Sequence, residues 1–177
     1  MNRKKSTLRF IVIAAVTIDG KIAFNSKHFT NWTSKEDKNF LHKILDTCDV
    51  VVVGHKTYEV AVKPLSERNC IVLTSKVRGS KQVKPNCLYC NPEKIDLKGL
   101  IAKFGYKKIA ILGGSQTYTY CLENKLLNEI FLTIEPIVFG QGLNLFQSKK
   151  SLMVKFTLGS VKKLNTQGSL LLHYVKV

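Results

Sequence analysis

Short apolar runs alternate with amphipathic stretches along most of the chain. The apolar runs predict strands, and they cover residues 8–16, 49–53, 70–73, 108–112 and 129–134. The amphipathic stretches predict helices over residues 34–45, 93–104 and 115–122. Thr33 or Ser34 can cap the first helix, with Glu36 and Asp37 in its first turn. Strands and helices in this alternation indicate an α/β sheet protein.

Two features refine that architecture. The valine run at residues 50–53 has no polar alternation, as expected of a strand that is covered on both faces of a parallel sheet. The tail, from about residue 154 to residue 177, predicts two strands joined through residues 165–168. Because 177 residues fit one domain, we expect a single domain over residues 1–177. Its predicted fold is a mostly parallel twisted sheet with flanking helices and a C-terminal antiparallel hairpin.

The N-terminus and the cysteines indicate in which cellular compartment the protein is expected. Residues 1–7 are basic and polar, and we expect them to be flexible. The apolar run after them predicts a buried strand rather than a signal peptide, because Asp19-Gly20-Lys21 stands where small cleavage-site residues belong. No run reaches the roughly 20 apolar residues that span a bilayer. Five cysteines without a secretion signal favour reduced thiols and a cytoplasmic protein.

Neither the C-x-x-C pair nor the charge indicates a metal or nucleic-acid site. Cys87 and Cys90 lie in an apolar run that predicts a strand, whose positions i and i+3 face opposite sides. The net charge of +16 comes mainly from lysines that are spread along the chain, whereas groove-reading proteins favour arginine. A basic nucleic-acid-binding module is therefore the least favoured alternative. A positive field would still attract anionic small molecules.

Three predicted strands end in small or hydroxylated residues, at the edge where α/β sheets bind ligands. Gly113 and Gly114 let the backbone approach a ligand, and Ser115 can cap the next helix, whose first N–H groups suit a pyrophosphate. Residues 54–57, Gly-His-Lys-Thr, repeat this arrangement, and residues 73–76, Leu-Thr-Ser-Lys, would suit a 2′-phosphate. Each segment alone is also consistent with a plain turn and cap, but three at one edge favour a dinucleotide.

The order of these residues resembles the dihydrofolate reductase family over most of the chain, to about Phe146. Residues 13–23 are similar to the family's first strand and the start of its mobile loop. Trp32 matches the family's tryptophan, and Asp37, five residues later, matches its active-site carboxylate. Residues 64–68 match a Pro-Leu-x-x-Arg stretch, and Leu132-Thr133 matches the strand whose threonine bonds that carboxylate.

The resemblance implies NADPH-dependent reduction of 7,8-dihydrofolate to tetrahydrofolate. Asp37 would orient the pterin and assist its protonation, with Glu36 as the rival carboxylate. Trp32 would wall the cleft, and Thr133 would orient Asp37. The implied substrate contacts are Ala15, Leu41 and Arg68, with the arginine meeting the glutamate carboxylate of the substrate. The implied NADPH contacts are Ala15, Ile22, Gly54, His55, Lys56, Thr57, Leu73, Thr74, Ser75, Lys76, Gly113, Gly114, Ser115, Gln116, Thr117 and Tyr118.

Residues 19–23, 32–34 and 135–142 instead resemble the related reductase of riboflavin biosynthesis, which reduces 5-amino-6-(5-phosphoribosylamino)uracil. That relative usually carries Asp-Pro-x-Leu-x-x-Arg. Here Lys63 precedes Pro64, and Arg68 falls four residues after the proline, as in the folate family. The spacing favours dihydrofolate and leaves the riboflavin substrate as the alternative. We expect a small-molecule partner, no nucleic acid or membrane, no metal, and a monomer or homodimer.

Overall fold

The computed structural model describes residues 8–177, so the expectation for residues 1–7 lies outside the described part. Within that part, nine strands form one sheet in the order β10-β11-β8-β1-β7-β3-β4-β6-β5. They are β1 (Arg9–Thr17), β3 (Val50–Gly54), β4 (Cys70–Leu73), β5 (Ser80–Lys84), β6 (Cys87–Cys90), β7 (Lys108–Ile111), β8 (Leu127–Glu135), β10 (Phe156–Lys163) and β11 (Leu170–Lys176). A small second sheet pairs β2 (Lys21–Ala23) with β9 (Leu143–Asn144). The helices are α1 (Lys35–Leu45), α2 (His55–Leu65), α3 (Leu97–Lys103) and α4 (Ser115–Glu123).

The centre of the large sheet is parallel. Strand β1 pairs in parallel with β7 and β8, β3 with β7 and β4, and β4 with β6. The antiparallel pairs lie toward the edges, where β11 joins β8 to β10 and β5 closes on β6. The predicted mostly parallel sheet and C-terminal antiparallel hairpin are confirmed. Because the central strands run the same way, their carboxyl ends meet at one edge.

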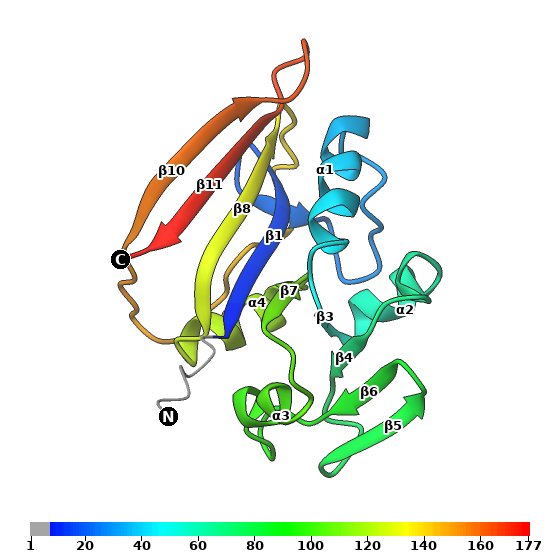
Figure 1. The fold of residues 1–177 in the computed structure, drawn as a ribbon. Helices are drawn as coiled ribbons and strands as arrows, with labels where there is room; N and C mark the ends of the chain where they lie inside the picture. The colour runs from blue at the N-terminus through cyan, green and yellow to red at the C-terminus, as the bar shows by residue number, and fades with distance from the viewer. Residues whose placement is uncertain (1–7) are drawn as a thin grey trace.

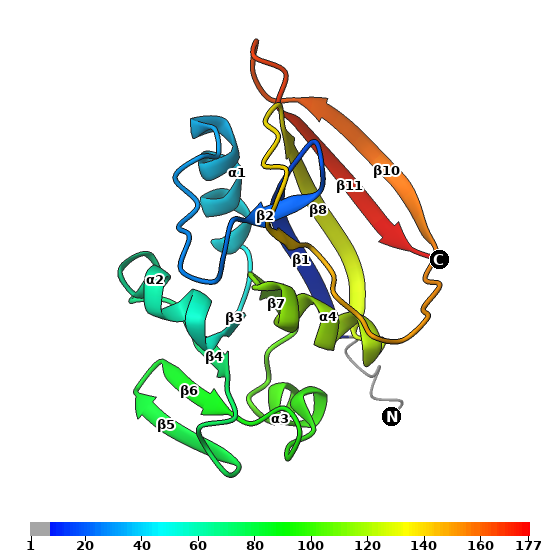
Figure 2. The same ribbon diagram turned by 180° about the vertical axis from the view of Figure 1, so that it is seen from behind.

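Helices cover both faces of the sheet. One core cluster joins the sheet to Ile44 and Leu45 of α1 and to Tyr58 of α2. The other joins the opposite face to Leu97 of α3 and Cys121 of α4. Figure 1 shows α1 beside the strands from one side, and Figure 2 shows α4 crossing in front of them from the other. Burial on both faces explains why the central strands are continuous apolar runs.

Several elements differ from the sequence expectation, among them the short strands β2 and β9, which were not predicted. The helix expected over residues 93–104 begins only at Leu97, because the carboxylate of Asp96 accepts a hydrogen bond from the N–H of Lys98 and caps it there. Strand β5 was not expected at all. All five of its residues are exposed at the sheet edge, so they carry no hydrophobic pattern that would reveal a strand.

The cysteines are unpaired in residues 8–177, which include all five of them. Cys87 lies in the core under α1 and α2, whereas Cys90 lies in the opposite core, as the strand periodicity predicts. Burial raises the pKa of the Cys70 and Cys121 thiols to about 12, which disfavours the reactive thiolate. Within the same residues, no cluster of three or more His, Cys, Asp or Glu side chains could hold a metal. No described helix is both long and apolar enough to cross a membrane.

Candidate active site

Asp37 lies in the first turn of α1, with 9% of its surface exposed. The helix starts there because Ser34 is its N-cap, and the Ser34 hydroxyl accepts a hydrogen bond from the N–H of Asp37 at 3.2 Å. This confirms the predicted helix start. The hydroxyls of Thr33 and Thr133 lie close enough to the Asp37 carboxyl to favour its charged form. Asp37 therefore joins the start of α1 to strand β8.

The pKa of Asp37 is raised above its usual value. Burial is the largest cause, because it removes water from the charged form. The nearby negative charge of Glu135 acts in the same direction, while the hydroxyls of Thr133 and Thr33 and the charge of Lys38 lower the pKa. A desolvated carboxyl with a raised pKa is suited to carry a proton nearer to neutral pH.

Trp32 precedes Asp37 and packs edge-on against Phe139, with ring centroids 5.1 Å apart. Phe139 also stacks on Phe24 at 4.0 Å. Within residues 8–177, the indole Nε1 of Trp32 is a buried side-chain donor with no hydrogen-bond partner. A buried donor without a partner is costly, so this N–H favours an acceptor from outside the chain.

The other predicted neighbours of the substrate lie on the same side of the sheet as α1. Ala15 pairs with Thr133 across β1 and β8, so both side chains share one face. Ala15 is half-buried although it lies in a central strand, and Leu41 on α1 is half-buried as well. Ala15 and Leu41 are therefore partly accessible apolar groups near the Asp37 carboxyl. Ile22, in β2, was predicted to contact the cofactor; it is half-buried and packs against the core on the other face of the sheet, under α3 and α4.

Two helices begin at the carboxyl edge of the sheet without a side-chain cap. Gly54 is the N-cap of α2 and Gly114 is the N-cap of α4, and neither end has a capping side-chain hydrogen bond. The N–H of Gly54 donates to the carbonyl oxygen of Gly113 at 2.7 Å, which holds the two ends together. The Gly113–Gly114 peptide bond is cis. Paired helix N-termini of this kind suit an anion.

Different local contacts explain why glycine occupies positions 54, 113 and 114. A β-carbon at Gly113 would lie 2.8 Å from the Tyr118 ring, and one at Gly54 would lie 2.8 Å from Thr117 Oγ1. Internal packing therefore requires both of these glycines. A β-carbon at Gly114 would lie 3.3 Å from Thr57 Oγ1, so it would project between the starts of α4 and α2. The starts of α2 and α4 therefore lie close together at this point.

Ser115 does not cap α4, which corrects the sequence expectation. The cap position is Gly114, and the Ser115 hydroxyl instead donates to the carbonyl oxygen of Asn144 in β9. Thr117 is buried, Gln116 is exposed, and the Tyr118 hydroxyl donates to the carbonyl oxygen of Ile13 at 2.9 Å. Backbone N–H groups, rather than the Ser115 hydroxyl, are thus the polar groups available at this helix start.

The other predicted cofactor residues also lie at this edge. The His55 imidazole approaches Glu59 at 3.3 Å and packs edge-on against Tyr89, while Lys56 is exposed. Leu73 is buried at the end of β4. The Thr74 hydroxyl accepts a hydrogen bond from the N–H of Lys76 at 3.2 Å, and Ser75 and Lys76 are exposed. The fold brings the three predicted strand ends together.

Arg68 lies apart from Asp37, where α1 ends. Its Nη2 donates to Asp46 Oδ1 at 2.6 Å, and Asp46 is the C-cap of α1. The guanidinium that was predicted to meet a substrate carboxylate thus already has a carboxylate partner within the chain.

Sequence reasoning missed two groups. Thr33 was considered only as a helix cap, yet its hydroxyl lowers the pKa of the Asp37 carboxyl. Glu135 is buried at the end of β8, where Ser34 and Ser169 donate to its two carboxylate oxygens. An acidic residue that closes an apolar strand signals a buried polar contact, but its partners come from distant segments.

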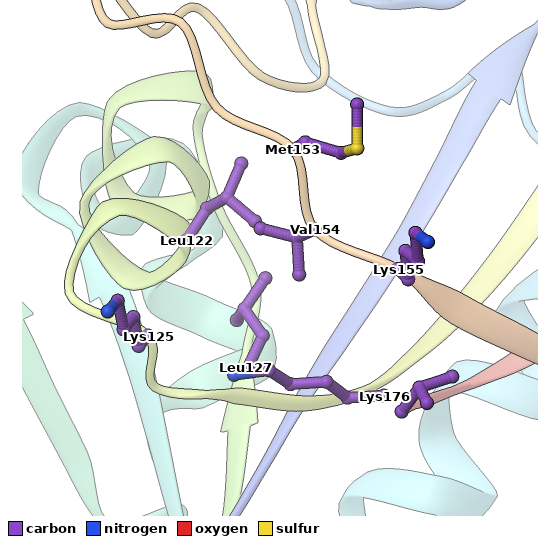
Figure 3. A pocket seen from close by; sticks show the side chains of 8 residues that line it. Leu122, Lys125, Leu127, Met153, Val154, Lys155 and Lys176 are labelled. Carbon is purple, nitrogen blue, oxygen red and sulfur yellow. The ribbon is translucent and has the colours of Figure 1, made fainter.

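A groove of about 240 Å³ lies elsewhere, between the end of α4 and the start of β8 (Figure 3). It is lined by Leu122, Lys125, Leu127, Met153, Val154, Lys155, Lys176 and Val177. Leu127 begins β8 and belongs to the core under α4. Thr133 and Glu135 lie toward the other end of that strand, so the groove is separate from the candidate active site.

Comparison with known proteins agrees with this arrangement. The family model described as dihydrofolate reductase matches residues 9–135. The uncharacterized protein YwjB of Bacillus subtilis (strain 168) is 24% identical over 174 residues, which are 94% of this chain and 97% of YwjB.

Two solved structures have the same fold. A pyrimidine reductase-like protein from Corynebacterium diphtheriae is 16% identical, with a TM-score of 0.78 over 96% of this chain and 92% of that one. Dihydrofolate reductase from Enterococcus faecalis, in a complex with NADP(H), is 20% identical, with a TM-score of 0.63 over 95% of this chain and 96% of that one.

The fold is the α/β fold that these two solved structures share. The match over more than half of its length shows that the chain belongs to the dihydrofolate reductase family. The predicted resemblance is therefore confirmed at the level of the family.

Proposed function

We propose that this protein is an NADPH-dependent reductase of a flat nitrogen heterocycle. The proposal is carried by the environment of Asp37. Its carboxyl is buried beside the hydroxyls of Thr33 and Thr133, and its pKa is raised. Such a carboxyl can accept hydrogen bonds from a ring N–H and a neighbouring amino group, and so fix a heterocycle in one orientation. With its raised pKa it can also take part in proton transfer to the reduced ring.

The residues at the carboxyl edge of the sheet fit a dinucleotide. The uncapped starts of α2 and α4 would hold its phosphates, because their N–H groups and helix dipoles favour anions. The exposed Lys76 and Ser75 would meet a 2′-phosphate, which is the basis for NADPH over NADH. When bound, NADPH supplies the hydride, and the protein supplies orientation and electrostatics.

The remaining groups have assignable tasks in that reaction. Thr133 and Thr33 orient the Asp37 carboxyl through their hydroxyls. Trp32 offers its unpartnered Nε1–H to a substrate oxygen or to a water. Ala15 and Leu41 supply apolar contacts beside the ring. Residues 54–57 and 113–118 would build the cofactor cradle, and their backbone N–H groups would make the contacts.

Dihydrofolate is the first candidate substrate, because Trp32, Asp37 and Thr133 match the folate-family pattern. A second candidate is favoured by one observation, the ion pair between Arg68 and Asp46. Since Arg68 is already paired, it is less available to bind the glutamate carboxylate of a folate. The aminopyrimidine 5-amino-6-(5-phosphoribosylamino)uracil, which lacks that tail, therefore stands beside dihydrofolate.

Two measurements test the proposal. NADPH consumption is followed by absorbance with each substrate in turn, and thermal unfolding is measured with NADPH and with NADH. We expect NADPH to raise the melting temperature, as any ligand of the native state does, and to be consumed only when a suitable heterocycle is present. A protein that NADPH does not stabilise, and that reduces neither substrate, would overturn the proposal. Asp37→Asn is the matched variant that should keep cofactor binding while losing turnover.

A further inference from the structure

Glu135 is the last residue of β8, with 3% of its surface exposed. It follows Thr133 by two positions, so both side chains leave the strand on the face that α1 covers. Its Oε1 accepts a hydrogen bond from the backbone N–H of Ser34 at 2.7 Å, and its Oε2 accepts one from the Ser169 hydroxyl. Both oxygens act as acceptors, as they do in an ionised carboxylate.

These contacts lead directly to Asp37. Ser34 is the N-cap of α1, and its hydroxyl accepts a hydrogen bond from the N–H of Asp37. Glu135 therefore holds the backbone of the residue that fixes the start of the helix. The position of the Asp37 carboxyl depends on this helix start, because Asp37 lies in the first turn.

The same carboxylate reaches the turn between β10 and β11. Ser169 lies in that turn, and the Asn165 side chain donates to the Ser169 hydroxyl at 2.9 Å. The Asn165 amide also reaches a carboxylate oxygen of Glu36 on α1, at 3.4 Å. Glu135 thus joins three segments, namely the start of α1, the end of β8 and the C-terminal hairpin turn.

Few charged groups act on the Asp37 carboxyl. On its own helix Lys38 lowers the pKa of Asp37, and from β8 Glu135 raises it. From α4 the buried Tyr118 hydroxyl is close enough for Asp37 to influence it. The hydroxyls of Thr33 and Thr133 complete the surroundings. Glu135 is the anionic member of this set, and it is buried, so solvent screens it little.

We propose that Glu135 is a positioning residue, which holds the start of α1, and with it Asp37, through Ser34 and places a buried carboxylate near the Asp37 carboxyl. Its buried charge opposes a second negative charge nearby, and its hydrogen bond to Ser34 fixes the helix start. The value of this arrangement for catalysis rests on the proposed function. Its effect on Asp37, however, can be measured in the protein without any substrate.

The experiment is a pH titration of the Asp37 side-chain carboxyl by ¹³C NMR, with the resonance assigned by its loss in Asp37→Asn. Glu135→Gln keeps the shape and an acceptor for Ser34 but removes the charge. The control is Glu129→Gln, which removes another buried carboxylate from the same face of β8, one that is paired with Arg9 and His173. If Glu135→Gln does not fold, Glu135→Met is a second route to an uncharged side chain of similar length.

We expect the Asp37 titration midpoint to move to lower pH in Glu135→Gln and to stay unchanged in Glu129→Gln. In the reductase assay the alkaline limb of the pH profile should move in the same direction, because less of the carboxyl is protonated. A folded Glu135→Gln protein with an unshifted Asp37 midpoint would overturn the inference, as would an equal shift in both variants. If neither substrate is reduced, the proposed function fails while the titration still decides the role of Glu135.

Discussion

Thr133 on β8 and Asp37 on α1 belong to different layers of the fold, yet the threonine hydroxyl lies close enough to the aspartate carboxyl to lower its pKa. This contact opposes the effect of burial, because a donor stabilises the charged form of the carboxylate. The net pKa of Asp37 is therefore a balance between desolvation and a few specific hydrogen bonds. Each contribution to this balance can be removed separately.

The Thr133→Val substitution tests the hydroxyl. Valine has almost the same shape but no donor, so the pKa of Asp37 should rise further. The carboxyl titration by ¹³C NMR should show a midpoint at higher pH, opposite to the shift expected for Glu135→Gln. A midpoint that stays in place or falls would show that Thr133 does not serve this carboxylate.

The Asp37→Asn substitution tests the carboxyl in catalysis. Loss of acid–base function typically lowers turnover by a factor on the order of 10²–10⁴. We expect this loss in NADPH oxidation with whichever heterocycle the protein reduces, and little change in NADPH-dependent thermal stabilisation. Glu36→Gln is the control, because Glu36 is the neighbouring exposed carboxylate. Near-normal turnover in Asp37→Asn would remove Asp37 from the reaction.

The same substitution should affect stability in a pH-dependent way. A raised native pKa means that the folded state binds the Asp37 proton more tightly than the unfolded chain does. The contribution of this group to the free energy of unfolding is thus present below the unfolded pKa, about 3.9, and is lost as the pH rises through the native pKa. Asparagine does not titrate. Urea unfolding between about pH 4 and pH 8 should show Asp37→Asn gaining stability relative to the native sequence as the pH rises. A relative loss would contradict the raised pKa.

The Arg68–Asp46 pair makes a prediction about specificity. Exposed ion pairs contribute about 0–1 kcal/mol, so Asp46→Asn should release Arg68 and lower the KM for dihydrofolate by up to about fivefold. The KM for a dihydropterin without the glutamate tail should not change. Arg68→Leu should weaken dihydrofolate far more than the tailless compound. Equal effects on both compounds would exclude Arg68 from substrate binding.

The two adjacent glycines should behave differently when each is replaced by alanine. Gly113 has a φ of +97° and no room for a β-carbon beside Tyr118, so Gly113→Ala should destabilise the fold by about 1–3 kcal/mol. Gly114 has a φ of −72°, which alanine accepts. Gly114→Ala should therefore unfold close to the native midpoint, yet bind NADPH more weakly, because its methyl group enters the space between α2 and α4. Undiminished NADPH stabilisation in this variant would place the phosphates elsewhere.

Local pattern determined much of this protein. The continuous apolar runs indicated the central strands, and the sequence from Ser34 to Asp37 indicated where α1 begins. Both depend on neighbours in the chain, through burial of a repeating face and through a cap three residues away. The C-terminal hairpin and the gathering of three strand ends at one edge followed from the same pattern.

Only the tertiary structure decided the partners of individual polar groups. Ser115 is a reasonable cap by sequence, but its hydroxyl finds Asn144 instead. Arg68 was predicted from the resemblance to meet a substrate carboxylate, but it meets Asp46 at the end of α1. The partner of Glu135 is not indicated by the sequence, because β8 places it against Ser34, 101 residues away along the chain. A hydrogen bond depends on position in space, whereas the sequence pattern records periodicity and propensity, so the elements could be predicted and the polar network around Asp37 could not.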